Sequence, residues 1–176
     1  ANPARGIFDV GPCAPRTRIV GHTRQGLVMQ DADHIAIPLL DGTYALAQIA
    51  QVEGDNVVLF LTHRTYRDRD TVSTIAPKNV MAIVPVSLSA LPKDHWRILG
   101  YDAVPDLNRT KTDFASEDIT LHDPAIIEAF ANAIHGLYPW DGFPYPAFFT
   151  NLLRRSDTVP PPARMTADFP APDASE

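Results

Sequence analysis

Cysteine, long apolar runs and the short motifs of common enzymes are scarce or missing in this sequence. Cys13 is the only cysteine in 176 residues, so the chain cannot form an intramolecular disulfide, and the sequence favours a cytoplasmic location. The longest unbroken aliphatic and aromatic run, Val57 to Leu61, is far below the roughly 18 residues that a membrane span needs. No charged-then-apolar signal segment opens the chain. We expect no membrane partner.

Catalytic and metal-binding patterns are also missing. The sequence contains no GxGxxG or P-loop phosphate motif, no HExxH, no paired CxxC and no GxSxG. The six histidines lack the i, i+2 or i+4 spacing that presents two imidazoles to one metal ion (His22, His34, His63, His95, His122 and His135). The sequence therefore predicts no catalytic residues, no cofactor and no metal site, and it favours binding over catalysis.

The charge of the chain is negative and unevenly distributed. A net charge of −6 disfavours a nucleic-acid partner, because the phosphate backbone repels an acidic surface. Between Tyr101 and Glu128 only Arg109 and Lys111 oppose seven acids. This window is either a solvated face or a surface that steers a basic partner. On the second interpretation, the partner-binding acids are Asp102, Asp106, Asp113, Glu117 and Asp118.

Five short β-like runs fill the region 27–100. HIAIPLL and TYALAQIAQV flank Asp41-Gly42, which predicts a two-residue hairpin turn of type I′. A second turn at 53–56 leads into VVLFLT, and NVMAIVPVSL and DHWRILG follow. Pro38 removes one ladder donor, which predicts an edge strand or a bulge. The region should fold as a small bent antiparallel sheet or an SH3-like barrel.

The second half of the chain predicts helices. Asp123 can cap a helix that Pro124 opens, an apolar stripe follows, and Gly136 supplies the stop. Pro146 could open a second, shorter helix. We expect one α+β domain in which the sheet packs against C-terminal helices. Its predicted parts are an irregular arm at 1–26, a β-rich core at 27–100, an acidic connection and helices at 101–155, and a proline-rich tail at 156–176.

Aromatic residues gather just after the first predicted helix. The stretch 138–149 holds six of the fifteen aromatic residues, among them Tyr138, Trp140 and Phe143. Four such rings represent roughly 600–1,000 Å² of surface, more than a soluble monomer usually exposes. They either cover the core between helix and sheet or serve as anchors of a protein-binding face. A mixture, with one ring exposed, is our expectation.

The stretch DADHIAIPLLDGTYALAQIAQVEGDNVVLFL resembles the opening of the immunity protein 26 family. The residues that carry the resemblance are Ile37, Pro38, Leu39, Asp41, Gly42, Tyr44 and Gln48, and it extends loosely over residues 33–100. The resemblance implies a mostly β bacterial protein that neutralises a cognate toxin by direct contact, without catalysis. An acidic surface would suit a basic toxin.

Two other interpretations remain open. The first is an enzyme or small-ligand module with a pocket between the sheet and the C-terminal helices. Such a pocket needs apolar walls and a few polar tips. Its predicted lining is Tyr44, Trp96, His135, Tyr138 and Trp140. The second is a homo-oligomer in which the proline-rich tail wraps a neighbouring copy.

Overall fold

The computed structural model describes residues 29–68, 70–155 and 159–170. Strands in chain order are β1 (Asp33–Pro38), β2 (Tyr44–Glu53), β3 (Asn56–Tyr66), β4 (Val80–Ser87) and β5 (Arg97–Tyr101). Helices are α1 (Pro124–Ile134) and α2 (Phe148–Leu152), and single 3-10 turns are η1 (Pro77–Asn79) and η2 (Thr166–Asp168). The fold is α+β and mostly sheet. The predicted arm at 1–26 and parts of the predicted tail, 156–158 and 171–176, lie outside the described residues.

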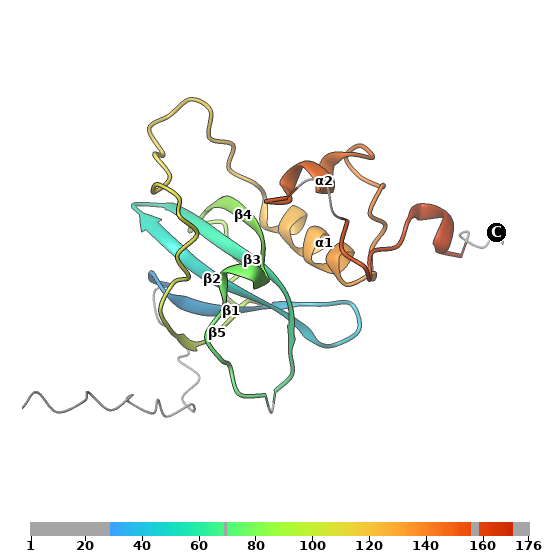
Figure 1. Ribbon diagram of the computed structural model, residues 1–176, viewed down its shortest axis with the longest axis horizontal. Coiled ribbons are helices and arrows are strands. Elements are labelled where there is room, and N and C mark those ends of the chain that lie inside the picture. The colour runs from blue at the N-terminus through green and yellow to red at the C-terminus, as the bar shows by residue number, and fades with distance from the viewer. Residues whose placement is uncertain (1–28, 69, 156–158, 171–176) are drawn as a thin grey trace, which may run out of the picture.

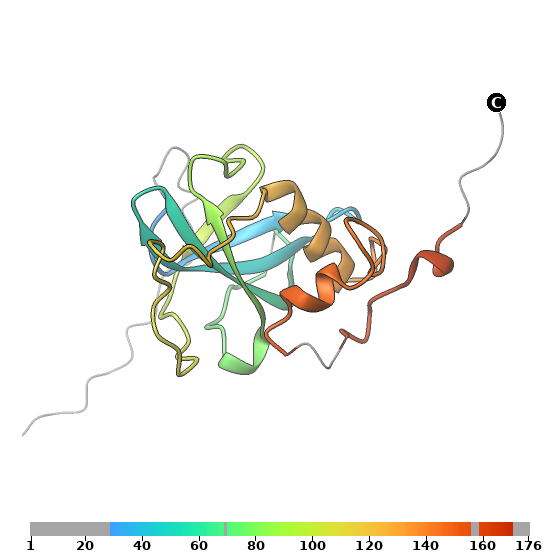
Figure 2. The ribbon, with the colours of Figure 1, turned by 90° about the horizontal axis from the view of Figure 1, so that it is seen from above.

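The five strands form one antiparallel sheet in the order β4-β3-β2-β1-β5. The sheet is open, with β4 and β5 at its edges. Strand β1 pairs with both β2 and β5 and is therefore an interior strand, so the edge position, one of the two alternatives predicted from Pro38, is wrong. A register shift, the other alternative, occurs in its pairing with β5 between His34 and Ile35. Pro38 is tolerated because it ends β1 beyond the β5 pairing, which stops at Ala36. The helices α1 and α2 lie together at one end of the strands (Figures 1 and 2).

The β1–β2 hairpin has a three-residue loop, and the predicted two-residue turn is wrong. Leu39 N–H donates to the carbonyl of Thr43 (2.9 Å), and Gly42 N–H donates to the carbonyl of Leu39 (3.1 Å). Gly42 has a φ of 81°, the left-handed conformation that follows a type I turn in such loops. The Asp41 carboxylate accepts hydrogen bonds from the amide and hydroxyl of Thr43.

The turn between β2 and β3 is as predicted. Glu53 pairs with Asn56, which leaves Gly54 and Asp55 as the connection, and Gly54 has a φ of 60°. The Asp55 carboxylate reaches the end of β4, where it accepts hydrogen bonds from the hydroxyls of Ser87 and Ser89 and from the Ser89 amide. One carboxylate therefore joins this turn to the edge strand.

Register shifts bend the sheet. They occur between His34 and Ile35 in the β1–β5 pairing, between Leu61 and Thr62 in the β3–β4 pairing, and at two places in the β2–β3 pairing. An extra residue in one strand turns the strand and increases its twist. The bend was expected from the short runs and tight turns, but the positions of the shifts carry no sequence signal.

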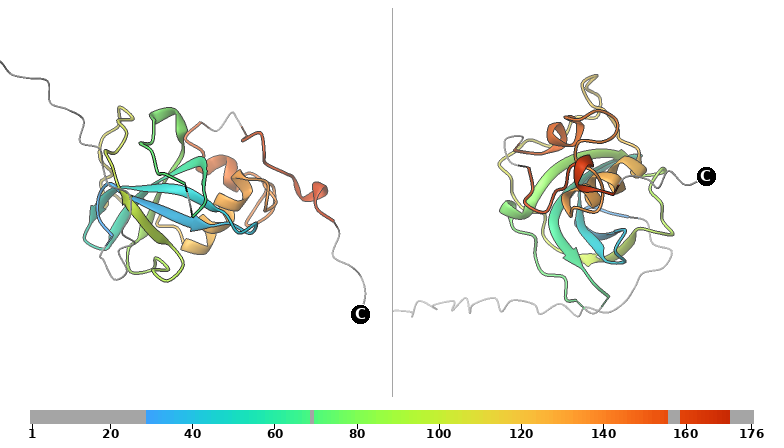
Figure 3. Two further views of the ribbon diagram at one scale, coloured as in Figure 1. Left: turned by 90° about the horizontal axis from the view of Figure 1, so that it is seen from below. Right: turned by 90° about the vertical axis from the view of Figure 1, so that its right-hand side faces the viewer.

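Both faces of the sheet are covered, so successive residues of the central strands are all buried. In β3, Val57, Leu59 and Leu61 face the helices, whereas Val58 and Phe60 belong to a second cluster on the other face. The first face packs against α1 and α2 (Figure 3). The connection between β5 and α1 covers the second face. The sequence had predicted that only one face of the sheet would be covered, by the C-terminal helices.

Helix α1 begins and ends where the sequence predicts. Asp123 caps it by accepting a hydrogen bond from the Ala125 amide (2.8 Å), and Gly136 follows its last turn with a φ of 73°. Its buried face is centred on Ile127, Phe130 and Ile134. Helix α2 is only five residues long, and it begins two residues after Pro146.

The outer edge of β4 and the described part of the tail are both paired within the chain. Ala82 forms an isolated antiparallel bridge with Leu153, and Val86 forms a parallel bridge with His122. Arg164 bridges Pro139, and its carbonyl accepts a hydrogen bond from the Trp140 amide (2.8 Å). Residues 159–170 therefore contact their own domain through Arg164.

Candidate functional site

The acidic segment, defined here as residues 102–118, has no regular secondary structure but is fixed to the outer face of the sheet. Gln51 exchanges two hydrogen bonds with Thr112, from its side-chain amide to the carbonyl (2.8 Å) and from the Thr112 amide to its side-chain oxygen (2.9 Å). Gln48 donates to the carbonyl of Asp102 (2.8 Å). The segment crosses the strands as an ordered connection (Figure 1). Apolar side chains that pack against the second cluster are Val104, Leu107 and Phe114.

The predicted acids of this segment lie largely on its exposed side. Asp106, Asp113, Glu117 and Asp118 are exposed. Asp106 and Asp113 accept hydrogen bonds from amides two residues further on, which fixes local turns without covering the carboxylates. Asp102 is half-buried and accepts a hydrogen bond from the Thr74 hydroxyl (2.6 Å). The structure therefore presents four carboxylates to solvent on a backbone that is pinned to the sheet.

The three predicted aromatic contacts differ in exposure. Trp140 is buried in the core, where its ring contacts Phe130 and Phe149, and its indole N–H donates to the Thr150 hydroxyl (3.0 Å). Its assignment to a partner-binding face is corrected, because a buried ring offers no contact surface. Tyr138 is half-buried against Phe149, whereas Phe143 is 64% exposed. The expected mixture of core cover and exposed ring is what the structure shows.

A chain of edge-to-face aromatic contacts joins the acidic segment to the exposed end of this loop. His122, four residues after Asp118, packs against Phe148 with ring centroids 6.1 Å apart. Phe148 packs against Tyr145 at 5.5 Å, and Tyr145 is 49% exposed. Burial lowers the pKa of His122. The exposed carboxylates and the exposed rings are therefore connected through rigid contacts.

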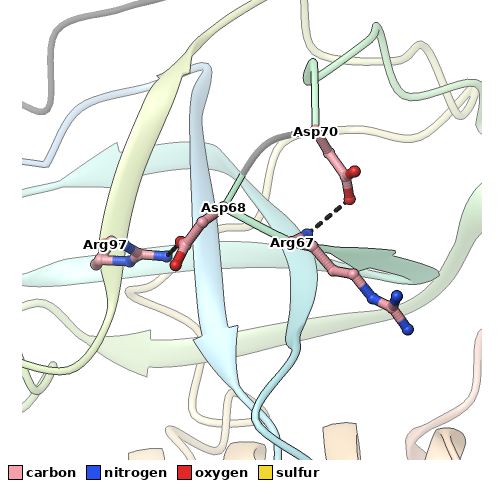
Figure 4. Close-up of polar contacts among 4 residues, drawn as sticks. All are labelled: Arg67, Asp68, Asp70 and Arg97. Atoms are coloured by element: carbon pink, nitrogen blue, oxygen red, sulfur yellow. Dashed lines mark hydrogen bonds and ion pairs between the residues drawn. The ribbon is translucent and has the colours of Figure 1, made fainter.

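The residues predicted to line a pocket do not share one. Tyr44 lies against Tyr66 and under the Arg97 guanidinium, 4.3 Å from the ring centroid. Arg97 pairs with Asp68 at 2.5 Å, beside the turn that Asp70 closes by accepting the Arg67 amide (Figure 4). This contact ties β5 to the loop after β3.

Trp96 is also placed away from any pocket. Its ring is buried in the first cluster, and its indole N–H donates to the Glu128 carboxylate (2.6 Å). This bond fixes the residue before β5 to helix α1. With Trp140 in the core and Tyr138 half-buried, His135 is the one residue of the predicted lining that borders the cavity described next.

A cavity of about 570 Å³ lies between the sheet, the helix ends and the tail. We call it the basic cavity. Its walls come from β3, from η1 and the start of β4, from the end of α1, from the end of α2 and from the tail. Its position between sheet and C-terminal helices agrees with the alternative prediction, although its lining differs. The lining residues are His63, Lys78, Val80, Met81, Ile134, His135, Leu153, Arg154, Arg155 and Pro160 to Pro162.

His135 has two roles at the end of α1. Its backbone amide donates to the carbonyl of Asn132 (3.2 Å) and so caps the end of the helix. Its side chain lines the basic cavity. Burial lowers the pKa of the imidazole, the charge of Asp41 acts in the opposite direction, and His63 lowers the pKa further. The ring is therefore favoured in its neutral form.

Sequence reasoning missed the basic cavity because its cations come from distant positions. Lys78 precedes β4, while Arg154 and Arg155 follow α2. Arg154 and Arg155 adjoin each other in the sequence, and three consecutive prolines follow at 160–162. Neither local pattern contains the information that the two segments meet.

No cluster of metal ligands accompanies these surfaces. Within the described part of the chain, no three His, Cys, Asp or Glu residues lie close enough together to hold a metal ion. The described helices include none with the length and apolar character needed to cross a bilayer. Comparison with known proteins finds no matching family model, no similar curated protein and no similar solved structure. The resemblance to the immunity protein 26 family therefore stays a prediction.

The docking of the tail should depend on pH through Asp141. Its carboxylate accepts hydrogen bonds from the amide (2.6 Å) and hydroxyl (2.8 Å) of Thr166, and these bonds hold the pKa of Asp141 below its ordinary value of 3.8. A lowered folded-state pKa stabilises docking above the unfolded value and is lost as pH falls through the folded value. We expect the Thr166 amide resonance to titrate below pH 3.8. Asp141→Asn should remove that titration, and its persistence in the variant would contradict this assignment.

Proposed function

We propose that this protein acts by binding a basic protein partner through the acidic segment, without catalysing a reaction. The observation that carries the proposal is the exposure of four carboxylates, those of Asp106, Asp113, Glu117 and Asp118, on a segment that is hydrogen-bonded to the sheet at Thr112. A preformed surface binds without the entropic cost of ordering a loop. Carboxylates at its rim accelerate the encounter with a basic surface.

The exposed aromatic rings provide the apolar contact surface that a purely charged interface would lack. Phe143 is 64% exposed and Tyr145 is 49% exposed, and aromatic side chains are the residues that most often anchor protein interfaces. Tyr145 contacts Phe148, which in turn contacts His122, four residues beyond the acidic segment. An interface with apolar anchors and a charged rim accounts for both features.

Within this proposal, the specific role is that of an immunity protein in the bacterial cytoplasm that neutralises a basic toxin. The resemblance over residues 33–100 motivates this role. The toxin-contacting residues would then lie mostly outside the β1–β2 hairpin, on the acidic segment and the loop at 141–145. This separation of scaffold from contact surface fits a fold whose sheet is covered on both faces.

Neutralising two carboxylates at the end of the acidic segment should weaken partner binding. We choose Glu117→Gln together with Asp118→Asn, because no described backbone amide is capped by these two side chains. Loss of two rim charges should lower the affinity by about three- to tenfold, mainly through a slower association rate. The partner is recovered by co-purification from the native cell, and the rates are measured by surface plasmon resonance at low and high salt.

The matched control is Asp31→Asn together with Asp94→Asn, which changes the net charge equally at two other exposed positions. The control should bind the partner nearly as the unmodified protein does. If both double variants lost the same affinity, the effect would be due to the net charge of the protein and not to the acidic segment. An affinity that does not change with salt would reject the acidic segment as the binding surface.

A further inference from the structure

The basic cavity has a charge that is unusual for this protein. The chain carries a net charge of −6, yet three permanent cations and two imidazoles line this one cavity. Among the described residues, no carboxylate belongs to the lining. In the described part of the chain, Lys78, Arg154 and Arg155 form no ion pair. Like charges gathered around one hollow repel one another, and a bound anion would relieve that repulsion.

Two residues of the lining each contain a buried nitrogen that lies below the surface of the cavity, so neither atom is a contact for a ligand there. The Nε atom of Arg154 and the Nε2 atom of His135 are both buried, and neither has a hydrogen-bond partner among the described residues. Buried polar atoms are paired in most proteins, because an unpaired one loses its hydration without compensation. The Arg154 side chain is held in place from its other end, where it donates to the carbonyl of Pro77 (3.0 Å).

The end of helix α1 does not cancel this positive potential. The carbonyls of Asn132 and Ala133 would present the negative end of the helix dipole to the cavity. They are already occupied, because the Leu137 amide donates to Asn132 (2.9 Å) and the Gly136 amide donates to Ala133 (3.1 Å). The cations therefore dominate the field inside the cavity.

The rest of the lining is apolar. Val80, Met81, Ile134 and Leu153 form the floor and sides, and the ring of Pro160 is buried beside them. A volume of about 570 Å³ falls within the usual range for sites that take small organic ligands. An inorganic ion alone would leave most of this apolar surface uncovered.

From the cations and the apolar walls, we propose that the basic cavity binds an amphipathic organic anion. The anionic head of the ligand, a carboxylate, phosphate or sulfonate, lies between Lys78, Arg154 and Arg155. Its apolar body lies against Met81, Leu153 and the proline wall. The lining of the cavity shares no residue with the acidic segment, so substitutions can test each site separately.

Two fluorescent probes with the same body and different charge test the proposal. Anilinonaphthalene sulfonate carries an anionic head, and phenylnaphthylamine is its neutral counterpart. We expect the sulfonate to bind the folded protein more tightly than the neutral probe. Lys78→Gln together with Arg155→Gln should weaken sulfonate binding about tenfold while leaving the neutral probe unaffected. Both side chains are exposed, so the double variant should keep the melting temperature of the unmodified protein.

Lys93→Gln together with Lys111→Gln is the matched control, because it removes two exposed positive charges outside the cavity. It should leave sulfonate affinity within about twofold of the original value, since screened charges at a distance act weakly. Methyl resonances of Met81 and Leu153 should shift on binding. Equal affinity for the two probes, equal effects of the two double variants, or the absence of these methyl shifts would each overturn the proposal.

Discussion

Replacing Trp140 with alanine is expected to lower the free energy of unfolding by about 3–5 kcal/mol. The indole is 2% exposed and lies among the rings of Phe130 and Phe149, with centroid distances of 5.9 and 5.8 Å. Its removal leaves a cavity that the short helix α2 cannot fill, and it also leaves the Thr150 hydroxyl without its donor. The change is measured by urea denaturation followed by far-ultraviolet circular dichroism.

Phe143→Ala is the matched control for this substitution, because it removes a ring from the same loop. With 64% of that residue exposed, the loss should stay below about 0.5 kcal/mol. The two variants should also separate the contribution of the loop to stability from its contribution to partner binding. Trp140→Ala affects stability, whereas Phe143→Ala affects affinity for the partner. A denaturation midpoint for Trp140→Ala equal to that of the unmodified protein would refute its role in the core.

The second large effect is expected from Gly136→Ala. A β-carbon at this position would lie 2.2 Å from the carbonyl oxygen of Pro162, a contact that requires the backbone of the tail to move. The φ of 73° adds strain of roughly 1–2 kcal/mol for any residue with a β-carbon. Detachment of the tail limits the total, because the clash then disappears together with the contacts of Arg164. We expect a loss of about 2–4 kcal/mol and faster proteolysis after Arg164.

Gly42→Ala separates strain from collision. Gly42 has a similar φ of 81°, but a β-carbon there meets no atom within 4 Å. Its cost should be the strain alone, about 1–2 kcal/mol, and the tail should remain protected from trypsin. Tail cleavage at the same rate in both variants would show that residues 160–164 are not docked against the end of α1.

Features encoded by neighbouring residues were predictable from the sequence. The cap at Asp123, the stop at Gly136 and the turn at Gly54 each depend on the conformation of one or two residues, and each is confirmed. The hairpin at Gly42 was placed correctly but given the wrong loop length. A glycine with positive φ fits both loop types, and only the pairing of Leu39 with Thr43 distinguishes them.

Features that depend on distant contacts were not predictable. The acidic segment carries Val104, Leu107 and Phe114 at spacings of three and seven residues, which would also suit one face of a helix, so the pattern does not indicate that an irregular segment packs on the sheet. Its anchors, Gln48 and Gln51, lie more than 50 residues away along the chain. Polar side chains in the middle of a strand were the available hint, because a buried amide needs a partner.

The candidate site likewise contains features that were predictable from the sequence and features that were not. Exposure of the acids was expected from their density, and a single exposed ring was expected from the size of the aromatic cluster. The basic cavity combines residues from five separate segments of the chain. Of its three permanent cations, only Arg154 and Arg155 are neighbours in the sequence. The alternative lining is not brought together because Tyr44 is engaged by Arg97 of strand β5 and Trp96 by Glu128 of helix α1, contacts between positions far apart in the sequence.

The edge of β4 has a consequence for how molecules of this protein meet one another. Sheets can grow between molecules when an outer strand offers free amides and carbonyls. On β4 the Met81 carbonyl already accepts the Arg154 amide, the Pro85 carbonyl accepts the His122 amide, and Pro85 has no amide hydrogen to offer. A foreign strand would therefore find few groups to pair with, and this edge resists the intermolecular stacking that begins fibril formation.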